Sequence, residues 1–175
     1  ETNLRAWLVV DASGSMGSIK GKVVTVFNQQ LKTIQKNATK TGQETFVSLY
    51  TFDNRVTRKY FAKQAQAVPP LTPKTYVLGG TTALLDAVGQ CVTEFGKMKD
   101  AKRDGTSFLV ITLTDGYENA SRKFNARKIS ALIKQVQATG KWSLAFLTPK
   151  SGIKTLEKFG RFNAGIVSLT TAPPP

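Results

Sequence analysis

Short runs of apolar residues alternate along this chain with longer stretches in which apolar residues recur at helical spacing. A continuous apolar run is typical of a strand buried on both faces, whereas recurrence every third or fourth residue indicates one face of a helix. The expected strands are Trp7–Val10, Phe46–Phe52, Val56–Phe61, Phe108–Leu113, Trp142–Leu147 and Ile166–Leu169. The helical stripes lie between them, at residues 23–34, 84–95, 129–136 and 153–159. This order predicts a doubly wound, Rossmann-like α/β fold, a three-layer α/β/α sandwich around a mostly parallel six-stranded sheet.

One strand is expected to run against the others. Val56–Phe61 follows Phe46–Phe52 after the turn signal Asp53-Asn54, which favours an antiparallel edge strand. Cationic side chains at such an edge discourage pairing with another sheet, and Arg58 and Lys59 lie in this strand. The proline- and glycine-rich stretch at residues 62–80 is predicted to be a loop, with room for a short helix.

The length of 175 residues is about that of one domain. We expect the domain to cover residues 1–170 and the proline-rich end, residues 171–175, to be a tail or linker. No apolar run is long enough to cross a bilayer, so we expect no membrane span. We also expect a monomer, located in the cytoplasm, or in a virion if the chain is phage-encoded. The single cysteine, Cys91, lies among apolar residues and is expected to be a small buried hydrophobe.

Three loops bring short oxygen-bearing side chains to one predicted edge of the sheet. Asp11-Ala12-Ser13-Gly14-Ser15-Met16 follows the first strand, Gly79-Gly80-Thr81-Thr82 precedes the second helix, and Thr114-Asp115-Gly116 follows the 108–113 strand. In a doubly wound sheet, ligands bind beyond the carboxyl ends of the strands, near the switch in strand order. We therefore expect the three loops to converge.

The residue types in these loops indicate a metal that prefers oxygen. Asp11, Ser13 and Ser15 alternate along one turn, and we expect Gly14 to let the backbone bend tightly there. The chain has no histidine, which removes the usual zinc or copper ligand and the commonest general base. Carboxylates and hydroxyls suit Mg²⁺, with Mn²⁺ or Ca²⁺ as alternatives. Two carboxylates, at least one acting through water, leave such an ion with a position for an Asp or Glu of a partner protein.

The same segments resemble the motifs of von Willebrand factor A domains. Asp11-Ala12-Ser13-Gly14-Ser15-Met16 is similar to the family's metal-ion-dependent adhesion site, residues 80–87 to its threonine loop, and Leu113-Thr114-Asp115-Gly116 to its aspartate loop. The resemblance covers essentially the whole chain and is strongest to short soluble bacterial and bacteriophage members. It implies a protein-binding module without catalysis. The metal ligands that it implies are Asp11, Ser13, Ser15, Thr82 and Asp115, with Thr81 as the competitor of Thr82.

Several neighbouring residues are candidates for supporting the site or touching the partner: Asp53, Thr81, Tyr117, Glu118 and Asn119. Tyr117 stands where relatives often have an acidic residue, so this aromatic ring could itself be a contact. Simpler interpretations remain open for each group. Serine and threonine are favoured helix N-caps, Asp53 suits a turn, and Asp86 suits the first turn of a helix. Trp7 and Trp142 are expected in the core.

Charge is the one outlying property of the composition. The chain has 25 Lys and Arg against 11 Asp and Glu, a net charge of +14. This excess could reflect solvated helix faces, or attraction to an acidic protein, a nucleic acid or an anionic surface. A basic structural or nucleic-acid-associated protein, for example of a virion, is therefore an alternative function. A Mg²⁺-dependent phosphatase with Asp11 as nucleophile is a weaker one, because Ser13 stands where such an enzyme would need a second carboxylate.

Overall fold

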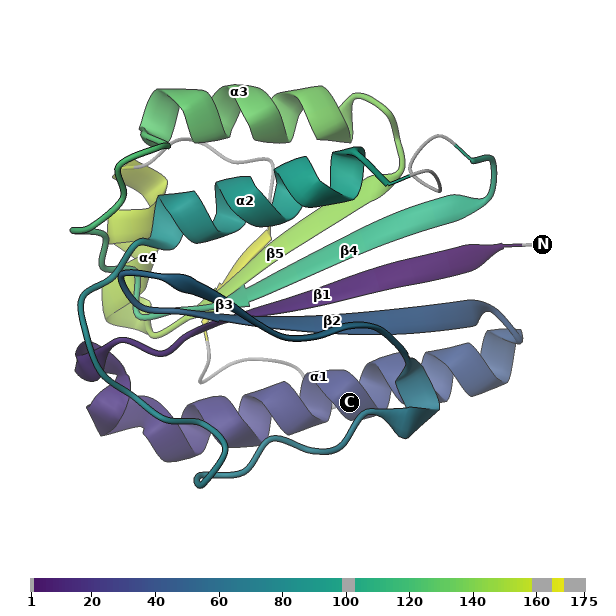
Figure 1. Cartoon of the computed structure of the whole chain (residues 1–175), viewed down its shortest axis with the longest axis horizontal. Coiled ribbons are helices and arrows are strands. Elements are labelled where there is room, and N and C mark those ends of the chain that lie inside the picture. The colour runs from purple at the N-terminus through teal and green to yellow at the C-terminus, as the bar shows by residue number, and fades with distance from the viewer. Residues whose placement is uncertain (1, 99–102, 159–164, 169–175) are drawn as a thin grey trace.

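Six strands form one sheet in the order β3-β2-β1-β4-β5-β6. The computed structural model describes residues 2–98, 103–158 and 165–168 (Figure 1). The strands are β1 (Asn3–Asp11), β2 (Glu44–Phe52), β3 (Val56–Gln64), β4 (Thr106–Leu113), β5 (Trp142–Thr148) and β6 (Gly165–Ser168). The α-helices are α1 (Lys20–Thr41), α2 (Leu84–Gly96), α3 (Ala126–Gln137) and α4 (Lys150–Lys158), and the 3₁₀ helices are η1 (Gly14–Ile19) and η2 (Ala65–Ala67).

β1 lies in the interior of the sheet, and most of its residues are buried. It pairs in parallel with β2 on one side and β4 on the other, so that Leu8 is opposite both Leu49 and Ile111. β5 and β6 continue the parallel sheet beyond β4, and only β3 is antiparallel, at the edge beside β2. The predicted sandwich with one antiparallel edge strand is confirmed. β3 is longer than predicted and ends at Gln64, just before η2.

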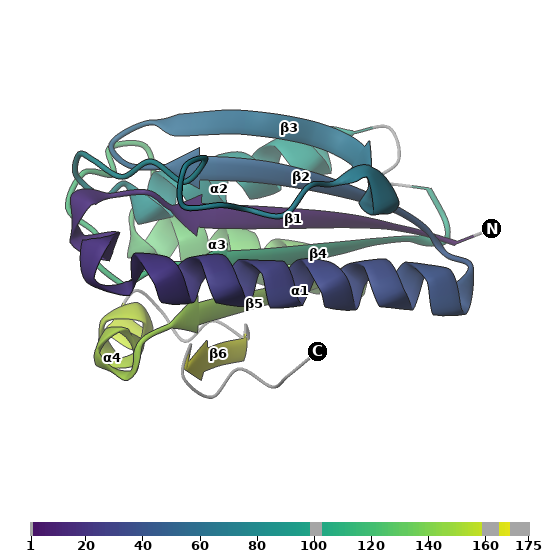
Figure 2. The same ribbon diagram turned by 90° about the horizontal axis from the view of Figure 1, so that it is seen from below.

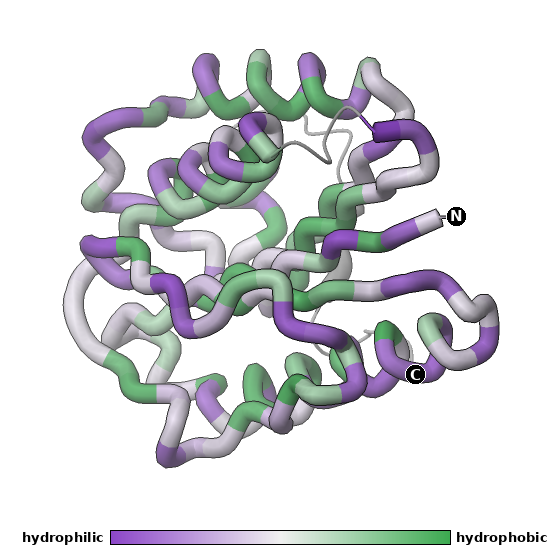
Figure 3. The backbone as a smooth tube through the Cα atoms, turned by 45° about the vertical axis from the view of Figure 1, so that its right-hand side comes forward, coloured by the Kyte–Doolittle hydropathy of each residue, from purple (hydrophilic) through white to green (hydrophobic). Residues whose placement is uncertain are grey.

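Alternate side chains of β1 supply two separate cores. Trp7 and Val9 pack with α2 and α3, while Ala6, Leu8 and Val10 pack with α1 on the other face. Figures 1 and 2 show these helices on opposite faces of the sheet. Figure 3 shows hydrophobic residues gathered along the central strands and on the inner sides of the helices. This is the burial expected of a doubly wound fold.

The predicted core residues are buried as expected. Trp7 and Trp142 belong to the same core cluster, and Cys91 is fully buried and has no disulfide partner among the described residues. Burial raises the pKa of the Cys91 thiol well above its ordinary value, which keeps the thiol protonated. Within the described part of the chain, no helix combines the length and apolarity that crossing a membrane requires. The predicted tail, residues 171–175, lies outside the described residues.

The strand order reverses at β1. From β1 the chain crosses through α1 to β2 on one side, and after α2 it enters β4 on the other side. The loops that leave β1 and β4 therefore lie above the same edge of the sheet, where doubly wound folds bind their ligands. In Figure 1 this edge lies at the left, where η1 and the N-terminus of α2 also lie.

Candidate metal centre

The first loop, residues 12–15, begins where β1 ends at Asp11, whose side chain is fully buried. Asp11 Oδ1 accepts hydrogen bonds from the Ser13 amide at 2.9 Å and the Ser13 hydroxyl at 2.6 Å. The Ser13 Oγ lies 3.1 Å from the Ser15 Oγ, and Ser15 is exposed. The alternate spacing of Asp11, Ser13 and Ser15 thus places three oxygen-bearing groups side by side.

The third loop, residues 114–121, completes this group from the end of β4. The Ser15 hydroxyl donates a short hydrogen bond to Asp115 Oδ2, and the Thr114 hydroxyl donates to Asp11 Oδ2 at 2.8 Å. Asp115 Oδ1 accepts from the Tyr117 amide at 3.2 Å. Asp11, Ser13, Ser15 and Asp115 therefore form one continuous chain of hydrogen bonds, although Asp115 lies more than a hundred residues from Asp11.

The second loop, residues 79–83, lies between the other two. The Thr82 amide donates to Asn119 Oδ1 at 2.8 Å, and the Thr82 carbonyl accepts from the Asn119 and Ala120 amides. On the other side, the Gly14 amide donates to the Gly80 carbonyl at 3.2 Å. Thr82 is buried, and its hydroxyl makes no hydrogen bond with any described residue. The three loops converge as predicted, with the Thr82 backbone anchored to the third loop.

Thr81 and Thr82 are directed to different places. Thr81 is exposed and lines a groove together with Asn119 and Asp86, whereas Thr82 is buried. Of the two threonines, only Thr82 is buried where the three loops meet. The geometry therefore favours Thr82 over Thr81 as a candidate ligand.

The second loop requires a glycine at position 80, for which no conformational role was predicted. Gly80 has a φ of 80°, and a Cβ there would lie 2.9 Å from Asn54 Oδ1 and 3.0 Å from Asp53 Oδ2. Gly14, expected to allow a tight bend, does not have a positive φ, and a Cβ on it would make ordinary contacts. The sharp turn thus belongs to the second loop and not to the first.

Burial and the neighbouring carboxylate alter the acidity of Asp11. Burial, helped by the neighbouring Asp115 carboxylate, raises its pKa from 3.8 to about 6 against the opposing effect of the hydrogen bonds from Ser13 and Thr114. The Tyr76 hydroxyl, from the irregular 62–80 stretch, donates a short hydrogen bond to the Asp11 carbonyl. Two carboxylates are thus joined through hydroxyl groups in a largely buried place, an arrangement that a cation would stabilise.

The remaining predicted residues order the loops. Asp53 Oδ1 accepts from the Arg55 amide at 2.8 Å, as in the turn expected for it. Glu118 accepts hydrogen bonds from the Leu85 amide and from Ser121, and so joins the third loop to the start of α2. Asn119 joins the third loop to the second by accepting a hydrogen bond from the Thr82 amide. Tyr117 is 60% exposed beside Asp115. These positions make Asp53, Glu118 and Asn119 structural supports and leave the Tyr117 ring available to a partner.

Three supporting contacts were not anticipated. Thr114 was part of a quoted motif but had no assigned role, and Tyr76 lies in a stretch without periodicity. Asp86 was expected only to favour the helix dipole, but its carboxylate accepts the amides of Arg122, Lys123 and Phe124. The one sequence signal for Thr114 was its position directly before Asp115 in the motif.

Comparison with protein families gives a direct match. The family model of the von Willebrand factor type A domain matches residues 7–160, which include all three loops. The chain belongs to the von Willebrand factor type A family. Domains of this family typically mediate protein–protein interaction through a metal-ion-dependent adhesion site, and are generally adhesion or interaction modules without enzymatic activity. A comparison with curated protein sequences finds no match.

Solved structures of other von Willebrand factor A proteins share the fold. Proximal thread matrix protein 1 from the mussel byssus, with a zinc-occupied MIDAS motif, matches 95% of this chain at 19% identity with a TM-score of 0.56. A von Willebrand factor type A protein from Catenulispora acidiphila matches 95% of this chain at 15% identity with a TM-score of 0.60. The pilus adhesin SpaC from Lactobacillus rhamnosus GG matches 96% of this chain at 15% identity with a TM-score of 0.63. The match spans 41%, 38% and 28% of these three longer chains, respectively.

Proposed function

We propose that this von Willebrand factor A domain binds a protein partner through one divalent cation held by Asp11, Ser13, Ser15, Thr82 and Asp115. An Asp or Glu of the partner occupies the coordination position that these side chains leave open. The observation that carries the proposal is the single hydrogen-bonded chain of Asp11, Ser13, Ser15 and Asp115 oxygens, with Thr82 buried in the second loop that adjoins it.

The spacing of these oxygens supports an octahedral ion. Neighbouring ligands of Mg²⁺ at about 2.1 Å are separated by about 3 Å along an octahedral edge. The Asp11–Ser13 and Ser13–Ser15 oxygen pairs lie at 2.6 and 3.1 Å, close to that edge length. Small shifts of hydroxyl groups, with loss of their hydrogen bonds to one another, would turn these lone pairs toward one ion.

The donor types support Mg²⁺, or Mn²⁺, as the occupant. All five side chains offer oxygen, and none of them is a His or Cys, the ligands that softer metals prefer. Ca²⁺ prefers more ligands than this set offers. The zinc-occupied MIDAS motif of the mussel protein supports a divalent ion at a site of this kind. We therefore propose Mg²⁺ with Mn²⁺ as its substitute.

Charge explains why the ion would bind a partner rather than remain enclosed. Two carboxylates and neutral hydroxyls leave an ion that still attracts an anionic oxygen, and Mg²⁺ exchanges its remaining waters for such a ligand. Ser15 is exposed and Tyr117 is 60% exposed beside Asp115, so the site faces outward. An aromatic ring at this rim gives the partner an apolar contact next to the metal.

The metal proposal is tested by thermal unfolding with and without divalent ions. We expect millimolar Mg²⁺ or Mn²⁺ to raise the melting temperature of the wild type, because a ligand bound only by the folded state stabilises it. Asp115→Ala should remove most of this rise. Asp104→Ala is the matched control, because Asp104 is an exposed carboxylate just before β4, at the opposite end of the strand from Asp115. Equal melting curves in Mg²⁺, Mn²⁺, Ca²⁺ and chelator would contradict the proposal.

Partner binding requires a separate assay. The wild-type domain, immobilised in Mg²⁺, should capture proteins that chelator releases, and Asp11→Ala should capture none of them. A captured protein that stays bound in chelator and also binds Asp11→Ala would argue against a metal-mediated contact.

Phosphatase activity is disfavoured by the surroundings of Asp11. A nucleophilic carboxylate needs an accessible oxygen, but both oxygens of Asp11 accept hydrogen bonds and the side chain is fully buried. Nucleic-acid binding through the basic surface, a monomeric state, a cytoplasmic or virion location and a domain boundary at residue 170 stay predictions from the sequence.

A further inference from the structure

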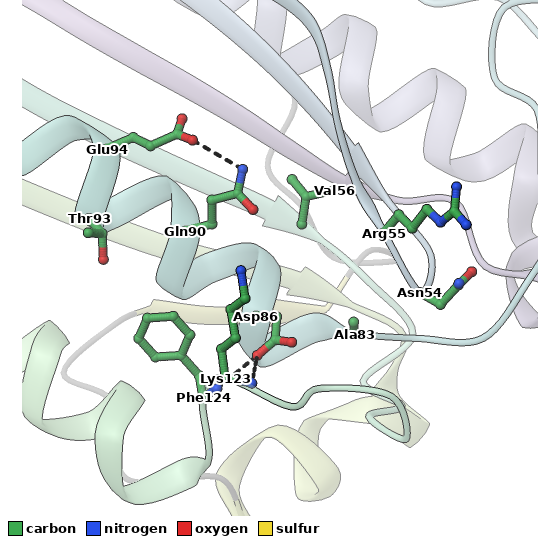
Figure 4. A pocket seen from close by; sticks show the side chains of 10 residues that line it. All are labelled: Asn54, Arg55, Val56, Ala83, Asp86, Gln90, Thr93, Glu94, Lys123 and Phe124. Carbon is green, nitrogen blue, oxygen red and sulfur yellow. Dashed lines mark hydrogen bonds between the residues drawn. The ribbon is translucent and has the colours of Figure 1, made fainter.

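A groove adjoins the candidate metal centre on the side of the second loop. Its walls are the turn between β2 and β3, the first turns of α2 and residues 119–124. It consists of two hollows of about 710 and 550 Å³, which share Asn54, Arg55, Asp86 and Lys123 in their linings. The smaller hollow is drawn in Figure 4, with Arg55 and Lys123 on opposite walls.

The larger hollow begins beside a proposed metal ligand. Thr81 and Asn119 both line it. Thr81 directly precedes Thr82, and the Asn119 side chain accepts the Thr82 amide at 2.8 Å. A partner segment that reached the metal could therefore continue into the groove without leaving the surface.

Within the described part of the chain, the cations of the groove have no anionic partners. Arg55, Arg122 and Lys123 are exposed, and none of them forms an ion pair with a carboxylate of the described residues. Their backbones are fixed, because Arg55 lies in the Asp53 turn and the amides of Arg122 and Lys123 donate to Asp86. Three cationic side chains thus project from ordered backbone around one groove.

The anions of the groove, in contrast, are already compensated. The Asp86 carboxylate accepts three backbone amides at 2.8 to 3.0 Å. Glu94 pairs with Arg58 at 3.3 Å and also accepts from the Tyr50 hydroxyl and, at 3.1 Å, from Gln90. The uncompensated charge of the groove is therefore positive.

We propose that this groove binds an acidic segment of the partner protein, with Arg55, Arg122 and Lys123 as the residues that select it. The inference rests on the proposed function, since the same partner places one carboxylate on the metal and its following acidic residues in the groove. An acidic peptide fits better than a single-stranded nucleic acid, because the aromatic ring in the lining, Phe124, is only partly exposed and packs against Gly89 of α2.

Two fluorescent peptides test the proposal by anisotropy at low ionic strength. One has a single Asp in a Gly-Ser background, and the other has the same Asp followed by four Glu. In Mg²⁺ the Glu-rich peptide should bind the wild type at least about fivefold more tightly, since two or three exposed charge pairs contribute a few tenths to 1 kcal/mol each. Added salt should reduce this advantage.

Charge-reversal variants locate the effect. The double variant Arg122→Glu/Lys123→Glu should lose the advantage of the Glu-rich peptide but keep its affinity for the single-Asp peptide and its Mg²⁺-induced rise in melting temperature. Lys32→Glu/Lys36→Glu on α1 is the matched control, because it changes the net charge equally on the opposite face of the sheet. Arg122→Gln/Lys123→Gln replaces the first variant if that one unfolds.

The outcomes separate the two proposals. The groove proposal would be overturned if the Glu-rich peptide kept its affinity advantage in Arg122→Glu/Lys123→Glu. It would also be overturned if Lys32→Glu/Lys36→Glu removed that advantage equally. The groove proposal would also be overturned if a single-stranded oligonucleotide displaced the Glu-rich peptide from the wild type while the peptide did not displace the oligonucleotide. If Mg²⁺ fails to shift the melting temperature, the metal proposal fails by itself. The groove is then judged in chelator, where the Glu-rich peptide should still lose affinity for Arg122→Glu/Lys123→Glu.

Discussion

Replacing Asp11 by Asn should make the metal-free protein more stable. Asp11 is fully buried, and burial raises its pKa from 3.8 to about 6. That rise corresponds to about 3 kcal/mol of destabilisation by the charged carboxylate at neutral pH. Asn keeps the shape and can still accept from Ser13 and contact Thr114, but its hydrogen bonds are weaker than those to a carboxylate. We expect a net gain of about 1–2 kcal/mol in the free energy of unfolding.

The pH dependence has a definite sign. The folded protein holds the Asp11 proton more tightly than the unfolded chain does, so the contribution of Asp11 to stability is most favourable below pH 4 and falls as the pH rises to about 6. Asp11→Asn lacks this titration. The difference in unfolding free energy between variant and wild type should therefore grow between about pH 4 and 6 and stay constant above that range.

Mg²⁺ should reverse the order of stability. An ion present at 100 times its Kd stabilises the wild type by about 2.7 kcal/mol, and Asp11→Asn should gain little of this. Urea unfolding followed by tryptophan fluorescence at pH 7.5, in chelator and in Mg²⁺, measures all four values. The reasoning would be refuted if Asp11→Asn were less stable than the wild type in chelator, or if the difference did not change with pH.

Three further substitutions probe the supports of the site. Asn119→Ala should lower the Mg²⁺ affinity by at least about tenfold in calorimetric titration, because the Thr82 amide loses the acceptor that positions the second loop. Gly152→Ala should cost about 1–3 kcal/mol in urea unfolding, because an added Cβ would overlap the backbone of the third loop. Tyr76→Phe should cost about 1–2 kcal/mol in the same assay, because the buried Asp11 carbonyl loses its hydroxyl donor.

Two of these substitutions have a matched control. Asn125→Ala removes the N-cap of α3 and should cost about 1 kcal/mol without changing the Mg²⁺ affinity. Gly17→Ala places a Cβ where no atom lies within 4 Å, so its cost should be small. If Asn125→Ala and Asn119→Ala weakened Mg²⁺ binding equally, the role of Asn119 in positioning the second loop would be wrong. Unchanged stability in Gly152→Ala or Tyr76→Phe would contradict the corresponding contact.

The periodic segments were predictable because their physics is local. The run Trp7–Val10 must be buried on both faces, and the structure gives it parallel neighbours on both sides. The predicted strand at 56–61 has an exposed, cationic pattern, and it became the antiparallel edge. Because parallel strands end at the same edge of a sheet, the loops after β1 and β4 must lie at one edge. This is why Asp11 and Asp115 could be paired from the sequence.

The irregular stretch at residues 62–80 was not predictable in the same way. Tyr76 has no periodic neighbours, and its contact with the Asp11 carbonyl joins residues 65 positions apart. Gly80 is required by the side chains of Asp53 and Asn54, which approach it from another loop. Such contacts depend on how whole elements pack, and no local spacing encodes them.

By itself, the sequence determined the alternation of strands and helices, the oxygen-only character of the candidate site and the basic net charge. These properties follow from residue types and their periodicity. Only the tertiary structure decided that the Asp11, Ser13, Ser15 and Asp115 oxygens form one hydrogen-bonded chain, that Thr82 and not Thr81 is buried beside it, and that uncompensated cations surround the adjoining groove. The physical reason is that a charge or a lone pair acts over a few ångströms, and folding alone brings residues a hundred positions apart within that distance.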